Sequence, residues 1–222
     1  MSRARNYFAW QSSLVTPELG RRVVEVGCGI GNFTERLLDR ELVVALDMEP
    51  GCVARLKQRY PNRKDLHAFT IDAASPAFLD LARYHPDSCV CLNVLEHIED
   101  DHAMIRAMAS ILVPRGVIVL IVPAFQALYG PIDRHLGHYR RYSRRSVARL
   151  ADEAGLRVCK THYMNATGFF GWWANAHIFH REAQSERQIE FFDRCLVPVI
   201  SRLEGLVPPP FGQSLFVVLE KP

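Results

Sequence analysis

The chain has 222 residues, of which 49% are hydrophobic and 23% are charged, and this is the composition of an ordinary globular protein. It excludes a disordered or collagen-like chain, and the length suits one domain that carries one or two insertions. The formal net charge of +3 is too small to indicate a nucleic-acid partner by itself. The sequence shows neither a membrane-spanning helix nor a secretory signal, so we expect a cytoplasmic protein.

Short β-branched runs alternate with segments of helical periodicity along most of the chain. We expect strands at residues 22–27, 42–46, 66–71, 88–92, 117–122, 156–164 and 215–219. We expect helices at residues 32–40, 51–60, 76–84, 100–112, 143–154, 167–180 and 188–204, with Ser75 and Ser143 as N-caps of two of them. This alternation predicts an α/β fold with a mostly parallel, doubly wound sheet whose ligand lies beyond the carboxyl ends of the strands.

The cysteines show no C-x-x-C spacing, which argues against structural zinc and favours reduced, buried thiols. They are Cys28, Cys52, Cys89, Cys91, Cys159 and Cys195.

Glycines and acids stand at the ends of the first three predicted strands. Gly27, Gly29 and Gly31 alternate directly after the first strand, where glycine allows positive φ and close approach of a ligand. Asp47 ends the second strand, where a carboxylate can accept both hydroxyls of a ribose, and Asp72 follows the third, where it can bind an adenine amino group. Each glycine could also be a plain turn and each aspartate a helix cap, but their joint order points to a nucleoside-like ligand.

Five segments, VVEVGCGIGNFT, LDMEP, IDAAS, CLNVLEHIEDD and LVPRGVIVLIVP, occur in an order that resembles the class I S-adenosylmethionine-dependent methyltransferases. The resemblance covers roughly residues 20–160 and implies a Rossmann-like, seven-stranded sheet with an antiparallel last strand. It implies one domain over residues 1–222. The aromatic residues Tyr7, Phe8 and Trp10 suggest that residues 1–19 cap the cofactor, and residues 165–210, which break the alternation and are rich in aromatic residues, are expected to form a helical insertion or lid. The implied cofactor is S-adenosylmethionine, bound by Glu25, Gly27, Cys28, Gly29, Gly31, Asp47, Met48, Asp72, Ala73, Asn93 and Val94.

The long segment at residues 123–143 is polar and aromatic, and a connection of this length is usually functional. It is similar to a bacterial subgroup of these enzymes with an L-Y-G-x-x-D-x-x-x-G-H-x-R-R-Y pattern and a P-P-F-G-Q-S-L ending. The candidate catalytic residues are His138, Asp133, His97 and His135, and His138 could equally order the loop. The candidate substrate-binding residues are Tyr129, Tyr139, Arg140, Arg141 and Tyr142.

We therefore expect methyl transfer to an oxygen or nitrogen of a small molecule. The arginine density favours an anionic substrate, and the aromatic insertion favours a partly apolar one, although the insertion could also be core, a dimer surface or a membrane contact. We expect a monomer or homodimer without nucleic acid and without a metal, since Asp100 and Asp101 are better explained as helix N-terminal acids than as metal ligands. The rival functions are a nucleic-acid methyltransferase, a nicotinamide-dependent oxidoreductase and a non-catalytic cofactor-binding protein.

Overall fold

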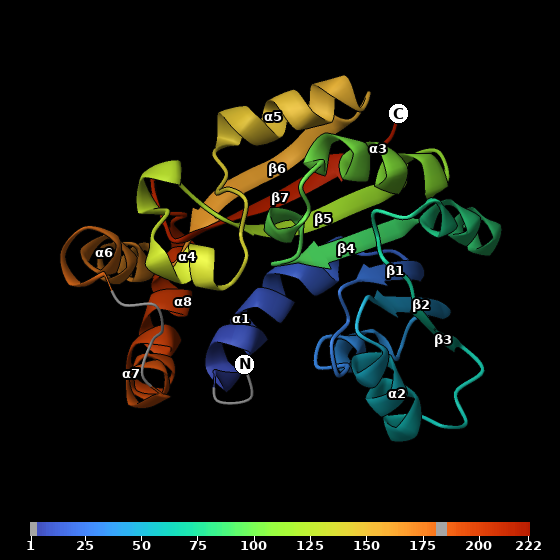
Figure 1. Ribbon diagram of the computed structural model, residues 1–222, viewed down its shortest axis with the longest axis horizontal. Coiled ribbons are helices and arrows are strands. Elements are labelled where there is room, and N and C mark those ends of the chain that lie inside the picture. Colours follow the sequence, from blue (N-terminus) through green and yellow to red (C-terminus); the bar gives the residue numbers. More distant parts are fainter. Residues whose placement is uncertain (1–3, 181–185) are drawn as a thin grey trace.

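The computed structural model describes residues 4–180 and 186–222, and its centre is a seven-stranded sheet (Figure 1). The strand order is β3-β2-β1-β4-β5-β7-β6. Strands β1 to β5 run parallel, and β7 is antiparallel to both β5 and β6. The predicted fold class, with its antiparallel last strand, is confirmed. The strands are β1 (Arg22–Val26), β2 (Leu42–Asp47), β3 (Leu66–Thr70), β4 (Ser88–Leu92), β5 (Val117–Pro123), β6 (Arg157–Met164) and β7 (Ser214–Glu220).

The helices cover both faces of this sheet. The α-helices are α1 (Arg5–Val15), α2 (Pro50–Arg59), α3 (Asp101–Ile111), α4 (Pro131–His135), α5 (Arg144–Glu153), α6 (Ala166–Ala174), α7 (Glu186–Phe191) and α8 (Val197–Leu206). Tighter 3-10 turns are η1 (Thr16–Glu18), η2 (Thr34–Leu37), η3 (Pro76–Tyr84), η4 (Leu95–His97) and η5 (Gln126–Leu128), and π-helical turns are η6 (Asn175–Phe179) and η7 (Phe192–Leu196).

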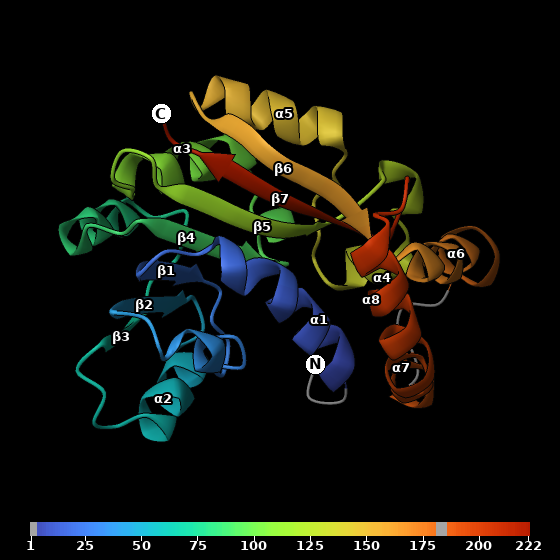
Figure 2. The ribbon, with the colours of Figure 1, turned by 180° about the vertical axis from the view of Figure 1, so that it is seen from behind.

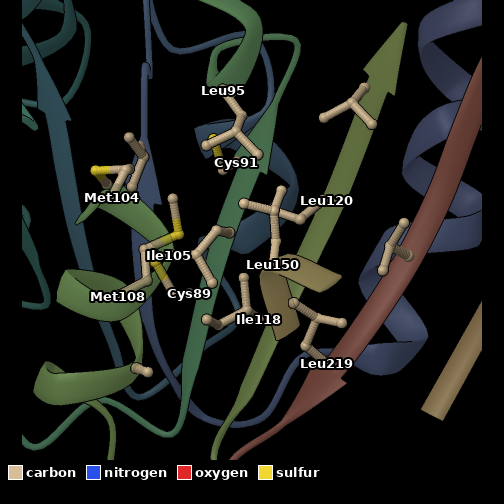
Figure 3. Packing of buried hydrophobic residues seen from close by; sticks show 14 of the residues in the cluster. Cys89, Cys91, Leu95, Met104, Ile105, Met108, Ile118, Leu120, Leu150 and Leu219 are labelled. Carbon is tan, nitrogen blue, oxygen red and sulfur yellow. The ribbon is translucent and has the colours of Figure 1, made fainter. Parts of the chain in front are cut away.

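Alternate residues of each central strand enter different layers of the core. Cys89 and Cys91 of β4 pack with Met104 and Met108 of α3 on one face (Figure 3). Val90, which lies between them, packs on the other face with residues of α1 and α8. This is the period of two that a strand buried on both faces requires. Seen from behind, α1 crosses the face opposite α5 (Figure 2).

Of three local predictions, two need correction and one is confirmed. Residues 32–40 form only the 3-10 turn η2, because the two buried residues Thr34 and Leu37 are three positions apart and a 3-10 turn places them on one side. Ser75 precedes η3, but its hydroxyl donates to the carbonyl of Asp72 instead of capping the helix. Ser143 does cap α5, since its hydroxyl accepts from the Ser146 amide at 3.1 Å.

The prediction of buried thiols holds for part of the cysteines. Cys28, Cys89 and Cys91 are buried, whereas Cys159 and Cys195 are exposed. Cys159 lies on the edge strand β6 next to Lys160, and both residues face solvent, so the strand does not bury the thiol.

The insertion between β6 and β7 is tied to the sheet by polar contacts. The first two amides at the start of α6, those of Asn165 and Ala166, donate to the Glu204 carboxylate of α8 at 2.8 and 2.9 Å. The Asn165 side-chain amide donates to Gln213, just before β7, at 2.7 Å. Residues 1–3 of the predicted cap and 181–185 of the predicted insertion lie outside the described residues.

The insertion is also bound to α1. The backbone amides of Asn6 and Tyr7 donate to the two carboxylate oxygens of Asp193 at 3.1 and 2.8 Å. Amides in the first turn of a helix have no partner within the helix, so the acid of η7 supplies one. Among the residues that the structure describes, no helix combines the length and the apolar character needed to cross a membrane.

Candidate active site

The glycine loop after β1 folds back against the end of β2. The amides of Gly27 and Cys28 both donate to the carbonyl of Leu46, at 2.8 and 2.9 Å. Gly27, Gly29 and Gly31 have φ values of +75°, +52° and +87°, the region that glycine tolerates best. A Cβ at Gly27 would lie 2.3 Å from the Val94 side chain, and one at Gly31 would lie 2.4 Å from Leu56.

Gly29 differs from its two neighbours because a Cβ there would meet nothing within 4 Å. The loop is thus closed by packing at its two outer glycines and open at the middle one. This half-buried backbone, with open space where a side chain would stand, can receive a ligand at van der Waals distance.

Two acidic strand ends lie beside this opening. Asp47 accepts from the amides of Gly29 and Glu49 at 2.8 and 2.9 Å, which fixes its carboxylate against the loop. Asp72, at the end of the neighbouring strand, is exposed and accepts from the Ala74 amide at 2.9 Å. Met48, directly after Asp47, is 67% exposed. A carboxylate has four lone-pair sites, so both acids keep capacity for a ligand's hydroxyl or amino groups.

Glu25 is buried beneath the loop, where its Oε2 accepts from the Thr34 hydroxyl at 2.6 Å. Burial, together with the charge of Asp47, raises the pKa of Glu25 from 4.5 to about 8. The carboxyl is therefore mostly protonated at neutral pH. The same burial raises the pKa of Cys28, so its thiol stays neutral.

We expect Glu25→Gln to flatten the pH dependence of stability between about pH 4.5 and 8. In that window folded Glu25 keeps a proton that the unfolded chain has lost, so rising pH lowers the free energy of unfolding of the native protein. The neutral amide removes this loss, which is on the order of a few kcal/mol. Urea unfolding at half-unit pH steps measures it. An unchanged slope in the variant would show that Glu25 does not titrate in this range.

The ends of β4 and β5 carry strained residues. Asn93, after β4, has φ +54° and donates its amide to the Ile121 carbonyl at 2.8 Å. Phe125, after β5, has φ +61°, which is rare for an aromatic residue. Val94 packs on Gly27, so the β4 end joins the glycine loop. Strained backbone of this kind clusters at functional sites.

Asp133 is the centre of a buried polar cluster in the loop after β5. Its side chain is fully buried and accepts from Arg141 Nε at 2.8 Å, from the Gly130 amide at 3.0 Å and from Trp172 Nε1 at 3.3 Å. His138 Nδ1 lies 2.9 Å from the same carboxylate. Burial alone would raise the pKa of Asp133, but these donors, with His138 and Arg141 foremost, hold it below its ordinary value.

The other predicted catalytic residues are placed differently. The His97 ring lies edge-on to that of His138, with centroids 4.6 Å apart; although the residue is exposed, desolvation by the surrounding protein and the neighbouring ring lower the pKa of His97. His135 is exposed at the end of α4. The structure thus brings together His138, Asp133 and His97 and leaves His135 at the surface.

The predicted substrate-binding residues fall into two groups. Tyr139 is 51% exposed, and the half-buried Tyr129 donates its hydroxyl to the His138 carbonyl at 2.7 Å. Arg141 and Tyr142 are buried, and their polar atoms bind the protein itself, because Arg141 pairs with Asp133 and Tyr142 donates to Asp101 at 2.9 Å.

Arg140 is also engaged, since it donates to the carbonyls of Ile98 and Glu99 and lies 3.1 Å from the Asp101 carboxylate. Arg140, Arg141 and Tyr142 therefore hold the loop in place. Asp100 caps α3 through the Ala103 amide at 2.8 Å, as expected of a helix N-terminal acid.

Sequence reasoning missed Glu96 as a site residue. Glu96 is 1% exposed, and its Oε2 has no hydrogen-bond partner within the described part of the chain. Burial raises its pKa to about 8. The Glu96-His97 pair after the fourth strand was the available signal, but its proximity to His138, which lies 41 positions beyond His97, depends on the fold.

A cavity of about 550 Å³ lies between α1 and the insertion. Its lining is mainly apolar and includes Tyr7, Gly171, Trp172, Phe179, Phe192 and Leu196. Trp172 belongs both to this wall and to the Asp133 cluster, so the cavity adjoins the loop after β5.

Comparison with known proteins gives one family. Residues 2–161 match the family described as a methyltransferase domain. The ubiquinone biosynthesis O-methyltransferase of Xanthomonas campestris is 36% identical over 107 residues, which cover 46% of this chain and 42% of that protein. The enzyme of the same name from Neisseria meningitidis is 27% identical over 165 residues, covering 65% and 67% of the two chains.

The match to the Xanthomonas enzyme spans about two fifths of that relative's length. Among solved structures, the N-methyltransferase NodS of Bradyrhizobium japonicum, in complex with S-adenosyl-L-homocysteine, aligns with a TM-score of 0.59 at 19% identity. That alignment covers 99% of this chain and 87% of NodS, and at this identity it shows a shared fold.

Proposed function

The chain belongs to the class I S-adenosylmethionine-dependent methyltransferases, with S-adenosylmethionine as cofactor, and from this premise we propose that it methylates a hydroxyl oxygen of a small, partly apolar acceptor. The open backbone at Gly29, flanked by Asp47 and Asp72, is the main support for placing the cofactor at the β1 and β2 ends. When bound, this cofactor supplies an electrophilic methyl group on a positively charged sulfur.

The residues at the strand ends fit such a group. Gly29 leaves room for a ligand against the main chain, and Asp47 is held where its remaining lone pairs can take ribose hydroxyls. Met48 offers an apolar surface for the adenine, and Asp72 and Ala73 lie at its edge. Asn93 and Val94, beside Gly27, would face the sulfur end.

The apolar cavity supports an acceptor with an apolar part. Aromatic and aliphatic side chains of α6, η6 and η7 line it, and Trp172 connects it to the Asp133–His138 pair. An acceptor that fills the cavity could present its hydroxyl to the loop after β5. Two relatives named as O-methyltransferases support oxygen over nitrogen as the methylated atom.

Methyl transfer to a hydroxyl requires that the acceptor oxygen be aligned with the methyl group and that the hydroxyl lose its proton. A hydroxyl acceptor becomes a strong nucleophile when it loses its proton, and a positioned imidazole can take it. The bond between Asp133 and His138 Nδ1 orients the ring and leaves Nε2 as the free nitrogen. For a displacement of this type, the larger part of catalysis is the alignment of the acceptor oxygen with the methyl group, and a pocket that excludes water supports this alignment.

The decisive experiment uses purified protein with a methyl-labelled cofactor and a matched panel of acceptors. The panel pairs phenols with anilines, each with and without an alkyl tail, and mass spectrometry identifies the methylated atom. We expect methyl ethers from the tailed phenols. Cofactor binding by calorimetry without any methylated product would contradict the proposed acceptor, and products on nitrogen alone would contradict the choice of oxygen.

We expect Gly171→Leu to raise the KM for the acceptor at least about tenfold while cofactor affinity stays unchanged. Gly171 lines the cavity, and a Cβ there meets nothing within 4 Å, so the added side chain occupies acceptor space. Gly205→Leu is the matched control, because Gly205 is a glycine of α8 with equally open surroundings outside the cavity lining. Equal KM values for the two variants would place the acceptor elsewhere.

Other features of the proposed function stay predictions. Several large apolar side chains of the insertion are exposed, among them Phe170, Ile178 and Phe191. They are consistent with the predicted membrane or lipid-like contact and with a homodimer. An anionic acceptor also stays a prediction, although Arg140 and Arg141, on which it was based, are bound to protein groups.

A further inference from the structure

Glu96, His97 and His138 form a compact group next to the glycine loop. Each offers one ligand atom, and the three atoms lie within 4.8 Å of one another. Glu96 and His97 belong to η4, directly after the β4 end, whereas His138 comes from the loop that follows α4. Val94, two residues before Glu96, packs on Gly27, so the group adjoins the proposed cofactor site.

Both imidazoles are oriented by a second contact. His138 Nδ1 is bonded to the Asp133 carboxylate at 2.9 Å, and the His97 ring lies close to the Gly137 backbone. In proteins, a histidine that binds a metal usually donates its other ring N–H to a carboxylate or a carbonyl. Arg141 and the Gly130 amide in turn hold Asp133. The outer hydrogen bond expected around a metal is therefore present for His138, and the Gly137 backbone is the neighbouring group that could supply one to His97.

Glu96 provides an independent observation. Its residue is 1% exposed, and Oε2 has no partner within the described residues. A buried polar atom without a partner is costly, and each such case calls for an explanation. A cation bound by Oε2 and the free imidazole nitrogens would remove the cost.

We propose that Glu96, His97 and His138 bind one divalent transition-metal ion, of which Zn²⁺ is a representative. Two imidazoles and one carboxylate form a donor set that transition metals accept and that leaves coordination positions open. The spacing of these residues along the chain could not indicate the site, because Glu96 and His97 are consecutive and His138 lies 41 positions beyond His97.

The role of the ion, unlike its binding, rests on the proposed function. A metal lowers the pKa of an oxygen that it binds, so an acceptor hydroxyl in an open position would release its proton to solvent water. The acceptor oxygen then forms the new C–O bond as the sulfur–carbon bond breaks, and the electron pair of that bond stays on a neutral thioether sulfur. His138 would then serve as a ligand, with the metal taking over the activation of the hydroxyl.

The test titrates untagged, chelator-treated protein with Co²⁺ and follows its visible ligand-field absorption, with Zn²⁺ binding measured in parallel by calorimetry. We expect one ion per chain. Glu96→Gln should weaken binding at least about tenfold, because the amide is a poor metal ligand, while the metal-free variant melts close to the wild-type temperature, because the amide has the shape of the carboxyl group that it replaces. His135→Gln, an exposed histidine of α4, is the matched control and should bind as wild type does.

Three outcomes would overturn the inference: no absorption or heat with the wild type, equal affinity in Glu96→Gln, or a thiolate-to-cobalt charge-transfer band. The last would place the ion on the exposed Cys159 or Cys195. Calorimetry with S-adenosyl-L-homocysteine on the metal-free protein separates the two proposals. If the protein binds the cofactor product but no metal ion in the titrations, this inference alone is contradicted. If it binds the metal ion but not the cofactor product, the proposed function alone is contradicted.

Discussion

Gly29→Ala is expected to weaken cofactor binding by roughly 10- to 100-fold while the protein stays folded. The backbone at Gly29 has φ +52°, so alanine costs about 1–2 kcal/mol of stability, which a folded domain survives. A Cβ there points into space that is empty of protein atoms, and a methyl group in ligand space costs about 1–3 kcal/mol of binding. Calorimetry with S-adenosyl-L-homocysteine measures the affinity, and urea unfolding measures the stability.

Gly155→Ala is the control that distinguishes the effect of backbone strain from the effect of a methyl group in the cofactor site. Gly155, between α5 and β6, has φ +67° and likewise nothing within 4 Å of an added Cβ. We expect the two variants to lose similar stability and only Gly29→Ala to lose affinity. A parallel fall in affinity for both would mean that the cofactor does not contact the middle of the glycine loop.

Asp133→Asn is expected to lower the free energy of unfolding by about 3–5 kcal/mol, because it leaves a buried guanidinium without its counter-charge. Arg141 is 5% exposed, and its Nε donates to Asp133. The amide also replaces one acceptor with a donor. If that donor takes the place of Oδ2, it faces the donating N–H groups of Gly130 and Trp172. Urea unfolding at neutral pH measures the loss.

Glu41→Gln is the control for an ion pair at the surface. Arg22 lies 2.7 Å from Glu41, but the two side chains are 33% and 42% exposed. Such pairs contribute at most about 1 kcal/mol. If Asp133→Asn lost only about 1 kcal/mol, the loop would have relaxed so that water reaches Arg141. Asp133 would then contribute little to the orientation of the His138 ring.

The sheet could be predicted from the sequence because its central strands are buried on both faces. Runs such as residues 117–122 are apolar throughout, and each predicted strand occurs within a residue or two of its observed ends. The helix at residues 32–40 could not be predicted correctly, since apolar spacing does not distinguish a 3-10 turn from an α-helix in so short a segment. Residues 5–15 form α1, although only their aromatic content suggested a capping segment.

The candidate site could likewise be predicted only in part. Gly29, Asp47 and Asp72 follow from the rule that ligands lie at the carboxyl ends of parallel strands. The roles of Arg141 and Glu96 could not be predicted from the sequence, because each role depends on which residues the fold places next to the side chain. An arginine that meets Asp133 inside the protein looks the same in sequence as one that meets a substrate.

The bond between Asp193 and the start of α1 has a consequence for the order in which the molecule assembles. Its partners are separated by 187 and 186 positions in the chain, so it forms only after almost the whole polypeptide has come together. The glycine loop closes on β2 over fewer than 20 positions. We therefore expect the wall between α1 and η7 to be the last part to form during folding and the first to detach, which would provide the acceptor with its entrance.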